Sequence, residues 1–212
     1  MATALQLVDD RIDLSLTDFI DFAIKSGTPK LSKVREIKGR GPYHPATDYW
    51  KAFRDFLQDR LETSHFSKSA LITFANEHRD PKKTVRYHQA AAGFAKFLGR
   101  KETKWFSPPH ALWTPSRLRV RINPELGLTI NSQRYAIKLY FKNDKLSMLR
   151  IDLLTFLMRN QLGTANPQYH FGVLEMATGT LFKAKEPAVD LMPLLLGEAA
   201  SFASMWDALG ER

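Results

Sequence analysis

The spacing of hydrophobic residues changes near residue 105, from a helical period to an alternating one. Over the first hundred residues, apolar side chains recur every three or four positions, as they do on the buried face of an amphipathic helix. Beyond a proline-rich border, segments with apolar residues at every second position predominate, as in strands with one buried face. The pattern predicts an α+β protein, with a helical region over 1–104 and a sheet region over 105–212, as two units or as one compact unit.

Capping residues and glycines indicate the ends of the helices in the first half. Ser15 and Asp18 have the spacing of a capping box ahead of an apolar stripe, and Gly27 is expected to end that helix. A loop rich in Lys, Gly and Pro is expected over 28–45. The further helices expected are one around 50–61, one that begins after Ser67, and one that starts with Asp80 as N-cap and Pro81, runs to Leu98 and stops at Gly99.

The second half predicts three strands, a helix, two further strands and a C-terminal helix, and thus a mixed or antiparallel sheet. Asn131-Ser132-Gln133 is expected to connect the second and third strands as a hairpin. The expected ranges are strands near 117–122, 126–131 and 134–142, a helix over 145–162 capped by Asn143 or Asp144 and stopped by Gly163, strands at 169–176 and 180–183, and a final helix over 188–209 that is bent or split near Pro193 and Gly197.

Two of the expected strands carry cations at alternate positions. Because side chains in a strand alternate between faces, the aliphatic residues between the cations are buried and the cations face outward. If these strands pair, the outer face is a cationic field that suits a polyanion, although a solvated face or an edge that resists aggregation has the same pattern. The residues of this cationic field are Arg117, Arg119, Arg121, Lys138, Tyr140 and Lys142.

The charge of the whole chain favours nucleic acid as the partner. The net charge is +9, and the positive residues are concentrated in the middle of the sequence, between net acidic ends. A second basic surface is expected at Lys82, Lys83 and Arg86, on the first turns of a helix whose amides also attract phosphate. The leading hypothesis is a DNA- or RNA-binding protein that contacts phosphates largely without reading sequence.

Aromatic residues beside the cations extend this hypothesis. Trp105 and Phe106 follow Lys104 directly. Aromatic rings next to cations stack on unpaired bases in many single-strand-binding proteins, and they also close the edges of hydrophobic cores. The sequence leaves both interpretations of this pair open.

Pro124-Glu125 and Lys138 also carry a resemblance to a nuclease family. In the PD-(D/E)XK nuclease superfamily, a Pro-Asp on one strand precedes an acid-x-Lys on the next, and residues 117–176 are similar in element order to that core. Ala136 stands where the second acid is found in the family. The resemblance implies a divalent-metal nuclease in which acids hold Mg²⁺ or Mn²⁺ and the lysine steadies the attacking water. The residues assigned to this alternative are Glu125, Asp152 and Glu175 as metal ligands and Lys138 as the electrostatic aid.

A third hypothesis is a non-catalytic adaptor or assembly protein whose basic face meets an acidic partner. In it, the apolar stripe of the C-terminal helix is a docking or homodimer surface, although a core-facing helix has the same stripe. The stripe consists of Leu191, Leu194, Leu195, Phe202, Met205 and Trp206.

Composition narrows the remaining chemistry. The chain has no cysteine, which excludes disulfides, thiolate metal sites and thiol nucleophiles. No apolar stretch approaches the roughly 20 residues that cross a bilayer, and the first residues do not have the pattern of a secretory signal. We therefore expect a cytoplasmic protein that makes no contact with membranes.

Overall fold

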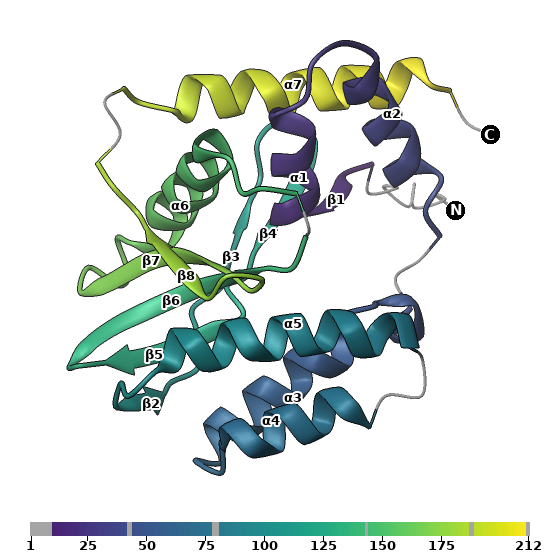
Figure 1. Cartoon of the computed structure of the whole chain (residues 1–212). Coiled ribbons are helices and arrows are strands. Elements are labelled where there is room, and N and C mark those ends of the chain that lie inside the picture. The colour runs from purple at the N-terminus through teal and green to yellow at the C-terminus, as the bar shows by residue number, and fades with distance from the viewer. Residues whose placement is uncertain (1–9, 42–43, 78–80, 143, 187–188, 211–212) are drawn as a thin grey trace, which may run out of the picture.

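The computed structural model describes residues 10–41, 44–77, 81–142, 144–186 and 189–210. Within these residues the chain forms seven α-helices, one short 3₁₀ turn and two mixed β-sheets (Figure 1). The α+β class and the C-terminal helix are confirmed.

Capping residues place several helices where they were expected. The Ser15 hydroxyl accepts a hydrogen bond from the Asp18 amide at 3.0 Å, and the Ser67 hydroxyl accepts one from the Ala70 amide at 3.0 Å. Gly99, with φ of +53°, follows the last turn of the longest helix. The helices are α1 (Leu16–Ala23), α2 (Gly27–Lys38), α3 (Lys51–Glu62), α4 (Lys68–Asn76), α5 (Pro81–Leu98), α6 (Met148–Leu162) and α7 (Met192–Ala208), with a 3₁₀ turn at Pro45–Thr47.

Proline in the first turn of a helix accounts for two wrong expectations. The segment 28–45, expected as a loop, contains most of α2, and Gly27, with φ of +59°, lies at the start of that helix. Pro29 lies in the first turn of α2, where its missing N–H has no helical partner to lose. For the same reason Pro193 opens α7 and does not bend it, and the helix continues through Gly197.

Some expected boundaries differ or cannot be compared. Ser147 caps α6, because its hydroxyl accepts a hydrogen bond from the Arg150 amide at 3.3 Å, so the expected cap at Asp144 is wrong. Gly163 ends that helix as expected. Three expected boundary residues lie outside the described part of the chain: Asp80, Asn143 and Ala188.

The strands form two separate sheets. A three-stranded sheet has the order β1-β4-β3, and a five-stranded sheet has the order β2-β5-β6-β7-β8. Asn131 and Ser132, with φ of 48° and 67°, make the tight turn between β5 and β6. The strands are β1 (Ile12–Ser15), β2 (Thr103–Trp105), β3 (Ala111–Trp113), β4 (Leu118–Ile122), β5 (Leu126–Ile130), β6 (Gln133–Tyr140), β7 (Tyr169–Glu175) and β8 (Thr180–Lys183).

The two strands with alternating cations do not pair. β4 lies between β1 and β3, whereas β6 is the central strand of the other sheet. The link between β6 and its parallel neighbour β7 is the helix α6, which covers one face, and α3, α4 and α5 cover the other (Figure 1). Lys138 and Tyr140 are consequently only 5% and 4% exposed, so the expectation that they face outward is wrong.

A hydrophobic core lies on each side of the five-stranded sheet. One core joins α1, α2, α6 and α7 to the three-stranded sheet and to one face of β6 and β7. The other joins α3, α4 and α5 to β5 and the opposite face of β6. Leu195 and Phe202 of α7 are fully buried in the first core, whereas Leu194 is 45% exposed. Most of the apolar stripe of α7 therefore packs inside the molecule.

Helix α5 touches the β7–β8 hairpin backbone to backbone. A Cβ atom at Gly93 would lie 1.8 Å from the Met176 carbonyl oxygen, and one at Gly179 would lie 2.3 Å from the Gly93 carbonyl oxygen. Gly179 also has φ of +69°, which side chains disfavour. Two glycines thus allow the helix to lie as close to the hairpin as the backbones permit.

Replacing Gly93 tests this contact. We expect Gly93→Ala to lower the free energy of unfolding by about 1–3 kcal/mol, because the methyl group forces α5 away from the hairpin. Gly197→Ala is the matched control, because nothing lies within 4 Å of a Cβ atom at that position of α7. The control should gain about 0.5–1 kcal/mol from helix propensity. Urea unfolding measures both, and equal stability of Gly93→Ala and wild type would contradict the contact.

Candidate functional site

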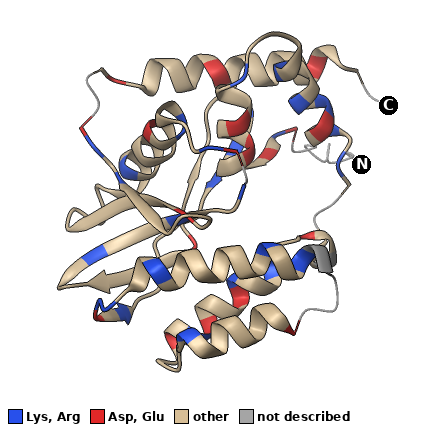
Figure 2. Ribbon diagram, viewed as in Figure 1, with Lys and Arg blue, Asp and Glu red and all other residues tan. Residues whose placement is uncertain are grey.

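The arginines of the predicted cationic field lie beside aspartates. The parallel pairing of β1 with β4 places Asp13 opposite Arg119, whose Nη2 lies 2.5 Å from the Asp13 carboxylate. Arg117 forms ion pairs with Asp10 at 3.0 Å and Asp207 at 2.8 Å. Figure 2 shows acidic and basic residues intermixed around α1, α2 and β1. The N-terminal and C-terminal acids therefore neutralise this part of the field.

The lysines of the field also have acidic partners. Lys138 Nζ lies 2.5 Å from Glu125 Oε1, and Lys142 pairs with the buried Asp21. Arg121 is the most exposed of the field's arginines and lies 3.8 Å from Asp13. The expected plate of five outward cations does not form, because the residues belong to two sheets and pair with acids.

The acids assigned to a metal site do not form one. Glu125 uses both carboxylate oxygens, one on Lys138 and the other on the Leu139 amide at 2.8 Å. Glu175 accepts a hydrogen bond from the Thr178 hydroxyl at 2.6 Å. Among the residues that the structure describes, which include Asp152, no three His, Asp or Glu side chains are grouped as metal ligands. The structure brings together only Glu125 and Lys138, and this donor set does not fit a divalent cation.

A buried cluster around Asp21 lies next to Lys138. Asp21, on α1, is 4% exposed, and its carboxylate pairs with Lys142 and lies 3.2 Å from Arg150 of α6. Lys33 of α2 lies 4.0 Å from the same carboxylate. This cluster was not predicted from the sequence. The signal was an aspartate inside the apolar run Phe19-Ile20-Asp21-Phe22, because a carboxylate on a buried helix face needs a cationic partner.

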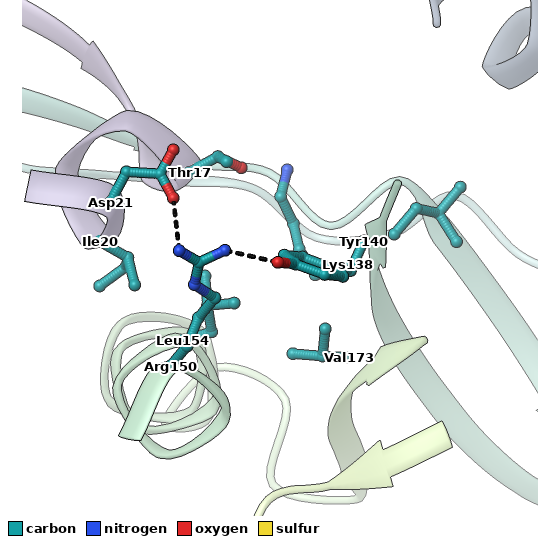
Figure 3. Close-up of a pocket in the computed structure, with 9 residues that line it drawn as sticks. Thr17, Ile20, Asp21, Lys138, Tyr140, Arg150, Leu154 and Val173 are labelled. Atoms are coloured by element: carbon teal, nitrogen blue, oxygen red, sulfur yellow. Dashed lines mark hydrogen bonds and ion pairs between the residues drawn. The ribbon is translucent and has the colours of Figure 1, made fainter. Parts of the chain in front are cut away.

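Tyr140 links this cluster to the central strand. Arg150 donates a hydrogen bond to the Tyr140 hydroxyl at 2.7 Å, and that hydroxyl donates to the Asp144 carbonyl at 3.1 Å. Burial raises the pKa of Tyr140, although the charge of Arg150 opposes the change, so the phenol stays neutral. Figure 3 shows these groups around a small cavity between α1, β6 and α6. The cavity is lined by Thr17, Ile20, Asp21, Lys138, Leu139, Tyr140, Arg150, Leu154 and Val173.

The groups around this cavity hold elements together. Asp21, Lys138, Tyr140 and Arg150 each have at least one polar partner inside the protein. These contacts satisfy charges that would be costly to bury alone. The arrangement therefore fixes α1 and α6 against β6 and has the character of a structural ion network.

The network extends to the surface through Asp18. Arg40 donates two hydrogen bonds to its carboxylate, at 2.9 Å and 3.1 Å, and Lys33 lies 3.0 Å away. Burial alone would raise the pKa of Asp18, but the hydrogen bond from Arg40 and the charge of Lys33 outweigh it and lower the pKa to about 2. Asp18 therefore stabilises the fold only while it is ionised.

The pH dependence of stability tests this role. Because the folded-state pKa is lowered, the contribution of Asp18 is present above about pH 4 and is lost as the pH falls toward 2. The difference between the ordinary value of 3.8 and about 2 corresponds to about 2 kcal/mol. In urea unfolding, we expect Asp18→Asn to be less stable than wild type at pH 6 and equal to it near pH 2.

An exposed aspartate provides the control for this experiment. Asp59→Asn removes the same charge from α3, where the side chain is 64% exposed, and should follow the wild-type profile. A gap between Asp18→Asn and wild type that stayed constant from pH 6 to pH 2 would contradict the assigned role of ionised Asp18.

Cations on α5 lie beside aromatic rings. Lys83 Nζ lies 5.2 Å from the centroid of the Tyr49 ring. Arg86 borders a hollow at the carboxyl end of β6, where the rings of Trp50 and Phe141 stack at 4.3 Å. The hollow has about 10 Å³ of space that water can occupy and is lined by Trp50, Arg86, Gln89, Ala90, Phe141, Met176 and Ala177.

These cations differ from the arginines of β4 in having no acidic partner. In the described part of the chain, no ion pair involves Lys83 or Arg86, and α5 has no acid in its first turn. Figure 2 shows basic residues on α5 and no acidic one. The side chain of Lys82, which was expected to belong to this surface, lies outside the described residues. We call Lys83, Arg86, Tyr49, Trp50 and Phe141 the α5 surface.

Comparisons with known proteins do not assign a function to this chain. No protein-family model matches the chain, and no curated protein matches it. No helix among the described residues is long and apolar enough to cross a membrane. The side chains and their contacts are therefore the basis for a functional assignment.

Proposed function

We propose that the protein binds nucleic acid through the α5 surface, mainly by contacts to phosphates. The observation that carries this proposal is the environment of Arg86. Arg86 lines a hollow with two stacked aromatic rings and pairs with no carboxylate among the described residues. An unpaired guanidinium is a preferred ligand for phosphate oxygens, because its planar donors match their geometry.

The distribution of charge supports a polyanionic partner. The chain carries a net charge of +9, yet the arginines of β4 lie against Asp10, Asp13 and Asp207. The cations of the α5 surface have no such acidic partners, so a polyanion that binds there does not have to displace a carboxylate. Phosphate contacts of this kind position a protein without reading sequence and depend steeply on salt.

The aromatic rings favour nucleic acid over an acidic polypeptide. Trp50 and Phe141 present rings beside the cation, and rings of this kind contact sugars and bases as well as backbone. The space in the hollow that water can occupy is about 10 Å³, which is room for about one water molecule. The hollow is therefore too small for a whole free metabolite, and a ligand at this surface contacts the residues around it.

Substitution of Arg86 tests the proposal. With a fluorescent 20-base-pair DNA duplex at low salt, we expect Arg86→Ala to weaken binding about tenfold, because one charged hydrogen bond is lost. The slope of log K against log salt should decrease by about 1, as expected for the loss of one phosphate contact. Fluorescence anisotropy at four salt concentrations measures both quantities.

Arg121→Ala is the matched control, because it removes the same charge from a side chain that is 56% exposed and remote in sequence. It should leave affinity within about twofold, since only the long-range field changes. Equal losses in the two variants would refute the α5 surface. Polyglutamate of the same charge as the duplex is the second comparison. Equal affinity for it would overturn nucleic acid in favour of an acidic protein partner.

A further inference from the structure

A row of exposed and half-buried side chains crosses four strands of the five-stranded sheet. Lys104 of β2 lies opposite Thr129 of β5, Thr129 opposite Arg134 of β6, and Arg134 opposite Tyr169 of β7. Directly opposed residues share a face, and four strands about 4.8 Å apart span about 14 Å. Lys104 and Arg134 are exposed, and Thr129 and Tyr169 are half-buried. We call these four residues and Phe106 the sheet row.

The ring of Phe106 lies on the sheet within this row. A Cβ atom at Gly127 would lie 2.8 Å from the Phe106 ring, so the glycine leaves the space that the ring occupies. The Phe106 and Tyr169 ring centroids are 5.0 Å apart, and the Arg134 guanidinium lies 5.5 Å and 5.6 Å from them. Arg134 also donates a hydrogen bond to the Tyr169 hydroxyl at 3.3 Å. The row thus combines two rings with two cations.

The cations of the sheet row have no acidic partner in the described structure. No ion pair found among those residues involves Lys104 or Arg134, whereas Arg117 and Arg119 each lie within 3.0 Å of a carboxylate. The row lies at the end of the sheet where β5 turns into β6, and the first turn of α5 lies toward the opposite end (Figure 1). The sheet row is therefore a separate surface from the α5 surface.

We infer that the sheet row binds single-stranded nucleic acid, with bases on the Phe106 and Tyr169 rings and phosphates at Lys104 and Arg134. This inference rests on the proposed nucleic-acid function and names a strand type for a second surface. Bases inside a duplex already stack on each other, whereas unpaired bases expose their faces to aromatic side chains. A flat face with rings, cations and a span of about 14 Å suits a few consecutive unpaired nucleotides.

Three fluorescent probes separate the two surfaces: a 20-nucleotide oligothymidine, the same phosphodiester backbone with abasic sites in its central ten positions, and the 20-base-pair duplex. We expect the wild-type protein to bind the oligothymidine about tenfold more tightly than the abasic strand, within the range of base stacking on aromatic residues. Phe106→Leu should reduce that difference, because only the Tyr169 ring remains, and leave duplex binding within about twofold. Arg134→Gln is the second variant, because it changes an exposed side chain and leaves the packing of Phe106 in place. It should weaken oligothymidine binding about tenfold and leave duplex binding unchanged.

The outcomes distinguish failure of the inference from failure of the proposed function. Equal affinity of the wild-type protein for the oligothymidine and the abasic strand would overturn the sheet row, and the α5 surface would stand if Arg86 still governed duplex binding. An unchanged base dependence in both Phe106→Leu and Arg134→Gln would also overturn it. Absence of binding to all three probes would overturn both proposals. Thermal melting of each variant confirms that folded protein is compared.

Discussion

From Tyr135 to Tyr140 the central strand β6 is covered on both faces, and this constraint organises the rest of the molecule. Over these residues the strand has no outward face, so Lys138 and Tyr140 need partners inside the protein. Glu125 supplies one partner and Arg150 the other. Arg150 in turn needs the carboxylate of Asp21. Burial of one strand thus accounts for a chain of ionic contacts that joins α1, β6 and α6.

The same constraint changes the meaning of the basic residues. Cations on the buried part of strand β6, or on strands beside aspartates, contribute to the fold, because each pairs with a nearby carboxylate. The cations proposed to meet a ligand lie elsewhere: Lys83 and Arg86 on α5, and Lys104 and Arg134 on the five-stranded sheet. Lys83, Arg86 and Arg134 lie close to aromatic rings. A positive net charge therefore says less about a binding surface than the positions of the acids do.

The sequence was sufficient to predict the helices with clear caps and the strands from 118 to 183, because these depend on local period and turn residues. It also predicted the β5–β6 hairpin, but it did not reveal that β4 pairs with β1 and β3 or that β6 pairs with β7. β1 has only four residues, yet its parallel pairing supplies the Asp13 that neutralises Arg119. The alternation in β6 predicted one solvent-exposed face. That prediction was wrong because a local pattern does not show that α6 crosses over this face. The cations of α5 could be predicted because they follow the expected start of a helix in the sequence. The sheet row could not, because it depends on the register of four strands.

The contact between Gly93 and Gly179 has a bearing on the hollow beside Arg86. Met176, whose carbonyl oxygen meets Gly93, also lines that hollow, so its floor lies where two backbones already touch. Neither α5 nor the hairpin can yield inward to admit a thicker group. Arg86 and Gln89 are lining residues with long side chains, and rotation of these side chains can change the shape of the hollow. The contact between the two backbones thus limits the depth of the hollow, and the rotamers of Arg86 and Gln89 set its width.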